Sequence, residues 1–324
     1  MEIFEGTTSP ILATLLFLVG LGLVIYFAEK LVEGAVGTSY GFGISTFLIS
    51  VLFIGFDPEN LVIGAVGSVE GVAGIALGSI IGAAMVAVAL AFGITALFAP
   101  LRFSQVPKQI ILVPNLAVLL LWLLGFDGEL SRGDGTLLLF GFCLSVIYLI
   151  RLSKKGLDIK PAGEVAETLQ HVKVSGKWKS LGLFILSLAF IIIGSEMLVV
   201  GSKTIIFHLG LSDMVFGMTI LAFLVSIEEI ARELPAALKG RPEISLGNVI
   251  GSVMAFFLFN AGIIALLAPV PVDAQVLRFY LPVCFGTVVI ISVFLMSRSI
   301  PRWAGGVLLL SYLIFVSGGY VWMP

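Results

Sequence analysis

Charged residues are scarce in this chain of 324 residues, because Asp, Glu, Lys and Arg together make up only 12% of it. Soluble proteins carry about 25% charged residues, whereas 59% of this sequence is hydrophobic. The net charge of −2 says little about partners, because the distribution of charge matters more than its sum. The composition therefore excludes a soluble globular protein and indicates an integral membrane protein.

Histidine and cysteine are also rare, with two residues of each type. His171 and His208 do not form a pair at metal-ligand spacing, and the sequence has no His-Glu-x-x-His pattern. Cys143 and Cys284 lie inside apolar runs, where cysteine acts as a small packing residue. We therefore expect neither a disulfide framework nor a histidine-based metal site, and we do not expect an enzyme.

The hydrophobic residues are gathered in long runs, and a membrane-spanning helix needs about 20 apolar residues. Alternating strand patterns are absent, so we predict an all-α polytopic membrane protein. The ten predicted spans are 10–28, 43–68, 72–98, 107–125, 135–152, 180–203, 212–238, 245–268, 276–296 and 304–321. The acidic N-terminal segment lacks the basic region of a signal peptide, so the first run is expected to be retained as a span.

Lysine and arginine are unevenly distributed between the loops, and this bias sets the predicted orientation. If the N-terminus is outside, the outside loops hold only Arg132, Lys203 and Arg278. The inside loops then hold Lys30, Arg102, Lys108, the segment 151–179, Lys239, Arg241, Arg298 and Arg302. We therefore predict a cell-membrane protein with both termini outside and a cytoplasmic linker at 153–179.

Two similar halves flank this linker. The segment 28–34 matches 195–201, and the segment 96–101 matches 265–270, at offsets of 167 and 169 residues. The predicted domains are a first repeat at 1–152, the linker at 153–179 and a second repeat at 180–324. Each half holds five predicted spans, and an odd number places the second half upside down relative to the first. Ten transmembrane helices in two inverted five-helix repeats are a transporter architecture.

Acidic residues interrupt the apolar runs at two places. The segment 57–60 reads Asp-Pro-Glu-Asn, and the segment 227–229 reads Ile-Glu-Glu. Each cluster is followed, after the same interval of 19 positions, by a Gly-x-x-x-Gly signature that begins at Gly78 or Gly247. An ionised side chain at the centre of a bilayer costs roughly 2.5–3.5 kcal/mol on insertion scales. Two such clusters in the same frame predict an ion site built from both halves.

The candidate cation ligands are the oxygen-bearing side chains of these clusters and of the glycine-containing spans. They are Asp57, Glu59, Asn60, Ser79, Ser226, Glu228, Glu229, Asn248 and Ser252. Hard divalent cations bind six to eight oxygens, several of them from carboxylates, so Glu59 and Glu228 are the strongest candidates. Neighbouring helical residues point about 100° apart, which leaves Asp57 or Glu229 available as a proton or Na⁺ site.

Two further residues of these clusters each have two interpretations. Pro58 removes a helix hydrogen bond inside the second predicted span. Either the backbone carbonyls that lose their partner bind a cation, or the proline simply kinks the helix. Arg232 follows Glu228 and Glu229 by one helical turn and can pair with either. Arg232 is then an internal counter-ion of the site or a charge near the inner mouth of the pathway.

These motifs resemble the calcium/cation antiporter superfamily, which includes sodium/calcium and proton/calcium exchangers. In that family each repeat carries a Gly-Thr-Ser-x-Pro-Glu or Gly-Asn-x-x-Glu signature, followed by a helix that contains Gly-Asn or Gly-Ser. Here the segments 57–59 and 226–229 stand for the first element, and 77–82 and 246–252 stand for the second. The resemblance implies ten helices, with spans 2, 3, 7 and 8 around the ion and spans 1 and 6 sliding across them.

The sequence departs from the family pattern within the predicted site. The Thr-Ser hydroxyl pair, which lines Na⁺ sites in sodium-coupled members, is replaced by Gly55-Phe56 in one repeat and reduced to Ser226 in the other. The loss of these hydroxyls favours H⁺ over Na⁺ as the coupling ion. The family spacing, counted back from Gly247, points to Glu229, whereas internal alignment with Glu59 points to Glu228. Both glutamates therefore stay candidates for the primary ligand.

We predict a secondary antiporter that exchanges Ca²⁺ or a related divalent cation for H⁺ or Na⁺, without a resident cofactor. Its expected partners are inorganic cations and the lipid bilayer, not nucleic acid. The oligomeric state is left open, and a monomer is expected to be sufficient for transport. The alternatives are a cation channel or a non-transporting ion sensor on the same fold.

Overall fold

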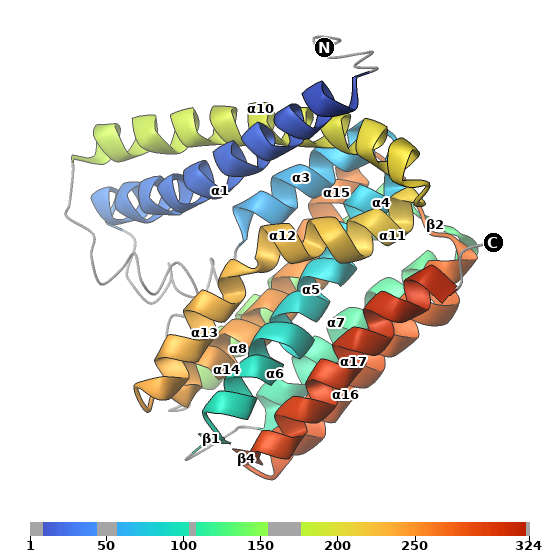
Figure 1. Ribbon diagram of the computed structural model, residues 1–324. Coiled ribbons are helices and arrows are strands. Elements are labelled where there is room, and N and C mark those ends of the chain that lie inside the picture. The colour runs from blue at the N-terminus through green and yellow to red at the C-terminus, as the bar shows by residue number, and fades with distance from the viewer. Residues whose placement is uncertain (1–8, 44–56, 104–107, 155–175, 322–324) are drawn as a thin grey trace.

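The computed structural model describes residues 9–43, 57–103, 108–154 and 176–321, which are mainly helical (Figure 1). Helices are the expected result of long apolar runs, because a helix satisfies its own backbone hydrogen bonds in lipid. In the first half the elements are α1 (Pro10–Gly41), α3 (Pro58–Val69), α4 (Ala73–Leu77), η1 (Gly78–Gly82), α5 (Ala83–Met85), η2 (Val86–Ala91), α6 (Phe92–Phe98), β1 (Leu101–Arg102), α7 (Lys108–Leu124), η3 (Gly125–Asp127), β2 (Glu129–Leu130) and α8 (Arg132–Lys154).

The second half is also mainly helical. Its elements are α10 (Lys177–Leu209), α11 (Asp213–Val215), η4 (Phe216–Leu221), α12 (Ala222–Ser226), α13 (Glu228–Leu238), α14 (Pro242–Met254), η5 (Ala255–Asn260), α15 (Ala261–Leu267), β3 (Val270–Pro271), η6 (Val276–Tyr280), α16 (Leu281–Met296), β4 (Ser299–Ile300) and α17 (Arg302–Val321). The segments η1, η2, η4, η5 and η6 are π-helical turns within longer helices, and η3 is a 3₁₀ turn. Such π-turns are rare and often lie at functional sites.

By length and apolarity, seven helices of the described residues can cross a membrane, and the bent pair 213–226 and 228–238 makes an eighth. The predicted span at 107–125 corresponds to a shorter apolar helix. The predicted span at 43–68 is described only from residue 57 onward, apart from its first residue. The count of ten spans and their inverted arrangement therefore stay predictions.

The helices α1 and α10 lie side by side along one edge of the molecule (Figure 1). They hold 32 and 33 residues, which corresponds to a length of about 48 Å each. The hydrocarbon core of a bilayer is about 30 Å thick, so helices of this length cross it obliquely or extend beyond it. Glycines bring the two backbones together, since a Cβ on Gly34 would lie 2.6 Å from the Phe184 nitrogen.

A second close crossing lies in the centre of the molecule, where α4 and η1 meet η4. A Cβ on Gly217 would lie only 1.9 Å from the carbonyl oxygen of Gly74, and a Cβ on Gly78 would lie 2.3 Å from the Gly217 backbone. The helix 73–98 and its counterpart 245–267 are the most buried spans, each 83% buried against 28–39% for the other five. The two glycine-containing spans that the sequence placed at the predicted site therefore form the core.

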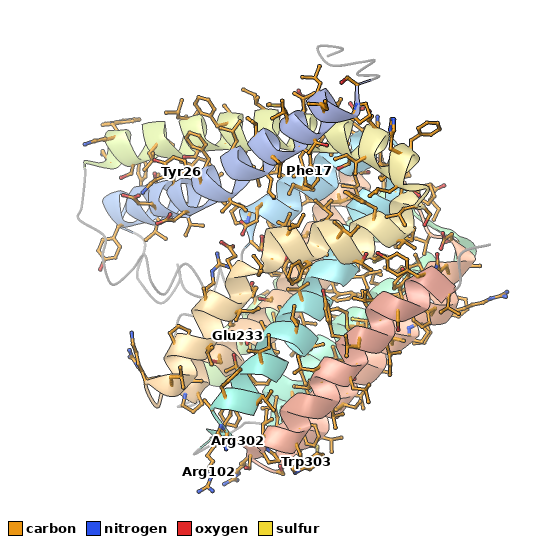
Figure 2. All side chains as sticks on the ribbon, in the orientation of Figure 1. Phe17, Tyr26, Arg102, Glu233, Arg302 and Trp303 are labelled. Atoms are coloured by element: carbon orange, nitrogen blue, oxygen red, sulfur yellow. The ribbon has the colours of Figure 1, made fainter. Side chains whose placement is uncertain are left out.

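Two short antiparallel ribbons join the halves. Strand β1 pairs with β4, and β2 pairs with β3. Arg102 and Arg302 lie together at the end of the molecule away from α1 and α10 (Figure 2). Both were predicted on the cytoplasmic side, and that orientation stays a prediction.

The outer helices expose apolar side chains, as lipid-facing surfaces require. Ile11 on α1 is 75% exposed and Phe207 on α10 is 82% exposed. Cys143 is exposed on α8, whereas Cys284 is buried on α16. The prediction that both cysteines are interior packing residues therefore holds only for Cys284.

Candidate functional site

The first acidic cluster forms the start of α3. Asp57 is the N-cap residue, and its carboxylate accepts a hydrogen bond from the backbone N–H of Asn60 at 3.1 Å. Pro58 occupies the first helical position, where its fixed φ suits the helix and its missing N–H is not needed. Pro58 thus begins a described helix rather than kinking one. The upstream carbonyls that it was predicted to free lie outside the described residues.

The second acidic cluster lies at a break between two helices. The axis bends by 49° between residues 213–226 and 228–238, although the break at Ile227 contains no proline. Glu228 and Glu229 occupy the first turn of α13. Helix N-termini carry a partial positive charge that stabilises acidic side chains. Both clusters therefore lie at the N-terminus of a helix that begins inside the protein, where acidic side chains are favoured.

Arg232 connects the two clusters. Its guanidinium lies 2.7 Å from Glu228 Oε1, 3.5 Å from Glu229 Oε1 and 3.9 Å from Glu59 Oε1. Its side chain is only 14% exposed. Of the two interpretations of Arg232, this geometry favours an internal counter-ion over a charge near the mouth of the pathway.

Asn248 links Glu229 to one further carboxylate. Its Nδ2 donates to Glu229 Oε2 at 2.5 Å and to Glu233 Oε1 at 3.1 Å. Glu233 is buried on α13 (Figure 2) and was not among the predicted ligands. The signal that identifies it is its position four residues after Glu229, which places both acids on one face of the helix. The network thus contains an acidic residue that the motif comparison missed.

A second chain of hydrogen bonds joins the two halves directly. Asn60 Nδ2 donates to Asp57 Oδ2 and to Ser226 Oγ, both at 3.0 Å. All three residues are buried. Ser226 stands immediately before the break in the second half, so this link ties the start of α3 to the end of α12.

Ser79 and Ser252 are less closely associated with the acids. Ser79 donates to the carbonyl of Ala76 in its own helix at 2.8 Å and packs against Gly64 of α3. Ser252 is buried on α14, one turn after Asn248. Among the hydrogen bonds of the described residues, none connects either serine to a carboxylate. Of the nine predicted ligands, the network therefore gathers seven.

The structure distinguishes the two glutamates that the sequence left open. The side chain of Glu229 is 2% exposed and is held by Asn248, whereas that of Glu228 is 29% exposed. Buried carboxylate oxygens of Glu59 and Glu233 have no hydrogen-bond partner among the described residues. An unpaired buried oxygen of this kind is costly unless a cation or proton satisfies it.

The carboxylates do not form a ready-made metal site in this arrangement. Among the described residues, no group of three or more His, Cys, Asp or Glu side chains is placed to hold a metal ion. The guanidinium of Arg232 instead lies among three of the carboxylates. The network offers the carboxylate oxygens that a hard cation needs as ligands. In this structure the positive charge beside them is the Arg232 guanidinium.

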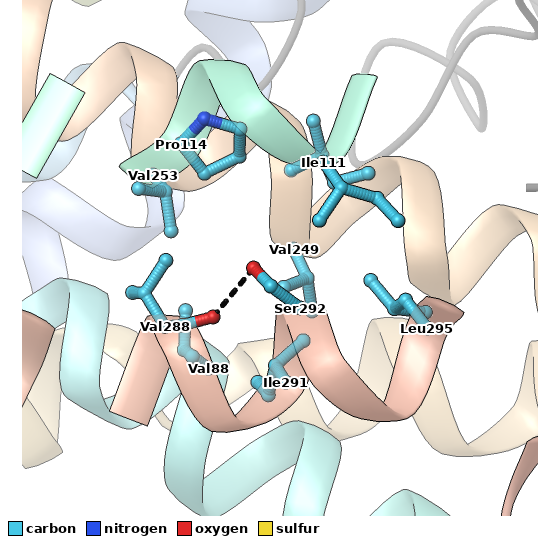
Figure 3. A pocket seen from close by; sticks show the side chains of 10 residues that line it. Val88, Ile111, Pro114, Val249, Val253, Val288, Ile291, Ser292 and Leu295 are labelled. Carbon is cyan, nitrogen blue, oxygen red and sulfur yellow. Dashed lines mark hydrogen bonds between the residues drawn. The ribbon is translucent and has the colours of Figure 1, made fainter. Parts of the chain in front are cut away.

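A small pocket elsewhere in the bundle does not compete as a cation site (Figure 3). It lies between α7, α14 and α16, and its lining is apolar apart from Ser292. The Ser292 hydroxyl donates to the carbonyl of Val288 within its own helix at 2.7 Å. Because this pocket contains no acidic residue, the carboxylate network is the candidate site.

Comparison with known families identifies the chain. The family model described as sodium/calcium exchanger protein matches residues 12–151 and 179–320. The chain belongs to the sodium/calcium exchanger family. The two matched ranges fall on either side of the predicted linker, and together they cover most of this member of the family.

Known relatives agree with this family. The chain is 30% identical to the putative antiporter CaxA of Alkalimonas amylolytica, over 82% of this chain and 83% of that protein. It is 25% identical to the sodium/calcium exchanger MaX1 of Methanosarcina acetivorans, over 93% and 97% of the two chains. It resembles a structure of the sodium-calcium exchanger NCX_Mj, with a TM-score of 0.61 and 28% identity, covering 95% and 99% of the two chains. This exchanger-family member therefore shares the family fold over nearly its whole length.

Proposed function

We propose that this protein is a secondary antiporter that exchanges Ca²⁺ or a related divalent cation for H⁺ or Na⁺ by alternating access. The observation that carries the proposal is the buried network of carboxylates at the meeting point of the two halves. Glu59 comes from the first half, and Glu229 and Glu233 come from the second. Two of the NCX_Mj structures were soaked with Na⁺ together with Sr²⁺ or Ca²⁺, which supports a divalent cargo.

The inverted repeat is supported by contacts that occur twice with the same offset. Gly34 packs against Phe184, and Gly201 packs against Phe17, so both members of the contact are shifted by the 167 residues of the repeat. The two ribbons behave in the same way, because each joins the segment after the third predicted span of one half to the segment before the fifth of the other. We therefore propose that the protein has ten spans in two inverted halves and that alternating access relies on this arrangement.

Exchange follows from the cost of moving an empty charged site through a low-dielectric centre. Carboxylates that bind a divalent cation must be compensated by another cation once it leaves. The reduced set of hydroxyls near the break, where Ser226 is already engaged by Asn60, favours H⁺ over Na⁺ as the coupling ion. We propose that the ion moves through the monomer, with both termini outside and the linker at 153–179 in the cytoplasm.

The proposal predicts Ca²⁺ release from proteoliposomes in response to a counter-ion gradient. Purified protein is reconstituted with Ca²⁺ inside, and Na⁺ and pH gradients are imposed separately while Ca²⁺ release is recorded. We expect release to accelerate under at least one gradient, because the incoming ion compensates the emptied carboxylates. Protein-free vesicles with the same gradients are the control.

Other outcomes distinguish the alternatives. Release that follows voltage but ignores both counter-ions would identify a channel. Ca²⁺ binding without any release would identify a non-transporting sensor. If no divalent cation moves or binds under either gradient, the proposed function is wrong.

A further inference from the structure

Arg232 lies among three carboxylates that are candidate cation ligands. Its guanidinium contacts Glu228 and Glu229 from its own helix and approaches Glu59 from the other half. Two of these three carboxylates are almost completely buried. The position that aligns with Arg232 in the first half is Ile63, so this positive charge is a feature of the second half.

The guanidinium cannot make way for a cation by losing its proton, because arginine stays protonated in proteins. It competes for the same carboxylate oxygens that a divalent cation needs. Of these three carboxylates, Glu228 lies nearest, at 2.7 Å, and its side chain is also the most exposed, at 29%. The guanidinium therefore has a route out of the site, in which it follows Glu228 while Glu59 and Glu229 stay in place.

We propose that Arg232 is a resident cation of the site, and that a divalent cation binds only by displacing its guanidinium from Glu59 and Glu229. This inference rests on the proposed function. In the absence of cargo, Arg232 supplies one of the positive charges that the buried carboxylates require. Arg232 thereby lowers the affinity for the divalent cation and stabilises the ion-free protein.

A purely structural ion pair makes a different prediction. If Arg232 serves mainly to hold the carboxylates in place, its removal lowers stability and weakens cation binding, because the ligands lose their arrangement. Removing a competing arginine lowers the stability of the ion-free protein and strengthens cation binding. The two roles are therefore separated by the direction of the change in affinity.

The test measures the unfolding temperature of the purified full-length protein against CaCl₂ concentration at constant ionic strength. For Arg232→Gln, we expect a lower unfolding temperature without Ca²⁺ and a half-saturating Ca²⁺ concentration reduced by about tenfold, which corresponds to about 1.4 kcal/mol. Arg232→Lys keeps the positive charge and is expected to stay closer to the parent. Arg132→Gln, which removes an exposed arginine at the start of α8, is the matched control and is expected to change neither quantity.

A double variant keeps the test decisive if Arg232→Gln folds poorly. Glu228→Gln combined with Arg232→Gln removes both members of the closest ion pair, so it restores the charge balance of the network. We expect it to regain ion-free stability and to bind Ca²⁺ more tightly than Glu228→Gln alone, because the guanidinium no longer competes for Glu59 and Glu229. Equal affinities of these two variants would contradict the competing role.

Two further results would overturn the inference, and they are distinguishable. If the parent protein transports and binds Ca²⁺ but Arg232→Gln binds it no more tightly, the proposed function stands and the competing role of Arg232 is wrong. If neither parent nor variants bind or move Ca²⁺, the proposed function fails and the inference fails with it.

Discussion

Glu229→Gln is expected to abolish divalent-cation exchange while leaving the protein folded. Glu229 is a buried acid of the network that contacts Arg232 at 3.5 Å and accepts a hydrogen bond from Asn248. Glutamine keeps the size of the side chain but removes its charge. One charge acting at about 4 Å in an effective dielectric of about 20 contributes about 4 kcal/mol, which corresponds to roughly a thousandfold change in affinity.

The measurement is counter-ion-driven Ca²⁺ release from proteoliposomes, with unfolding temperature as the check on folding. Glu33→Gln is the matched control, because Glu33 is exposed and pairs with Lys30 in its own helix. Exposed pairs contribute about 0–1 kcal/mol, so this variant should transport like the parent. Glu228→Gln should be less damaging than Glu229→Gln, and the opposite order would show that Glu228 is the primary ligand.

Gly217→Ala is expected to prevent the central helices from assembling. The added Cβ would lie 1.9 Å from the oxygen and 2.4 Å from the carbonyl carbon of Gly74. These are backbone atoms, so no side chain can rotate away. Overpacking in a well-packed core costs about 1–3 kcal/mol when side chains adjust, and a backbone collision is expected to exceed that range.

Size-exclusion chromatography and thermal unfolding of the detergent-solubilised protein measure this effect. Gly22→Ala is the matched control, because a Cβ at Gly22 would meet nothing within 4 Å. Replacing a helical glycine by alanine favours the helix by about 1 kcal/mol, so the control should be as stable as the parent or more so. Equal unfolding temperatures for the two variants would contradict the close crossing.

The crossing at Gly217 also explains how the site is held. It joins η4, which leads through α12 to Ser226, to the helix that begins with α4 and carries Ser79. Because the backbones touch, the broken helix of the second half is fixed against the core of the first half. The distance between the two acidic clusters therefore depends on glycines that are themselves not ligands.

Helix lengths show where sequence patterns fall short. The predicted spans at 10–28 and 180–203 end where polar residues begin, but α1 and α10 continue to Gly41 and Leu209. Part of the reason is local, because Lys30 and Glu33 pair across one helical turn at 3.0 Å. The rest is tertiary, because glycine contacts along the pair stabilise turns that hydropathy alone does not predict.

The sequence by itself determined the membrane class, the family resemblance, the two acidic clusters and the pairing of Arg232 with its neighbours on the same helix. These features follow from short-range rules, namely apolar runs, helix starts and contacts three or four residues apart. Only the tertiary structure decided that Glu59 joins them, that Glu233 belongs to the network and that Glu229 is more buried than Glu228. The physical reason is that burial and contacts between the halves depend on how the helices pack, and no local pattern specifies that packing.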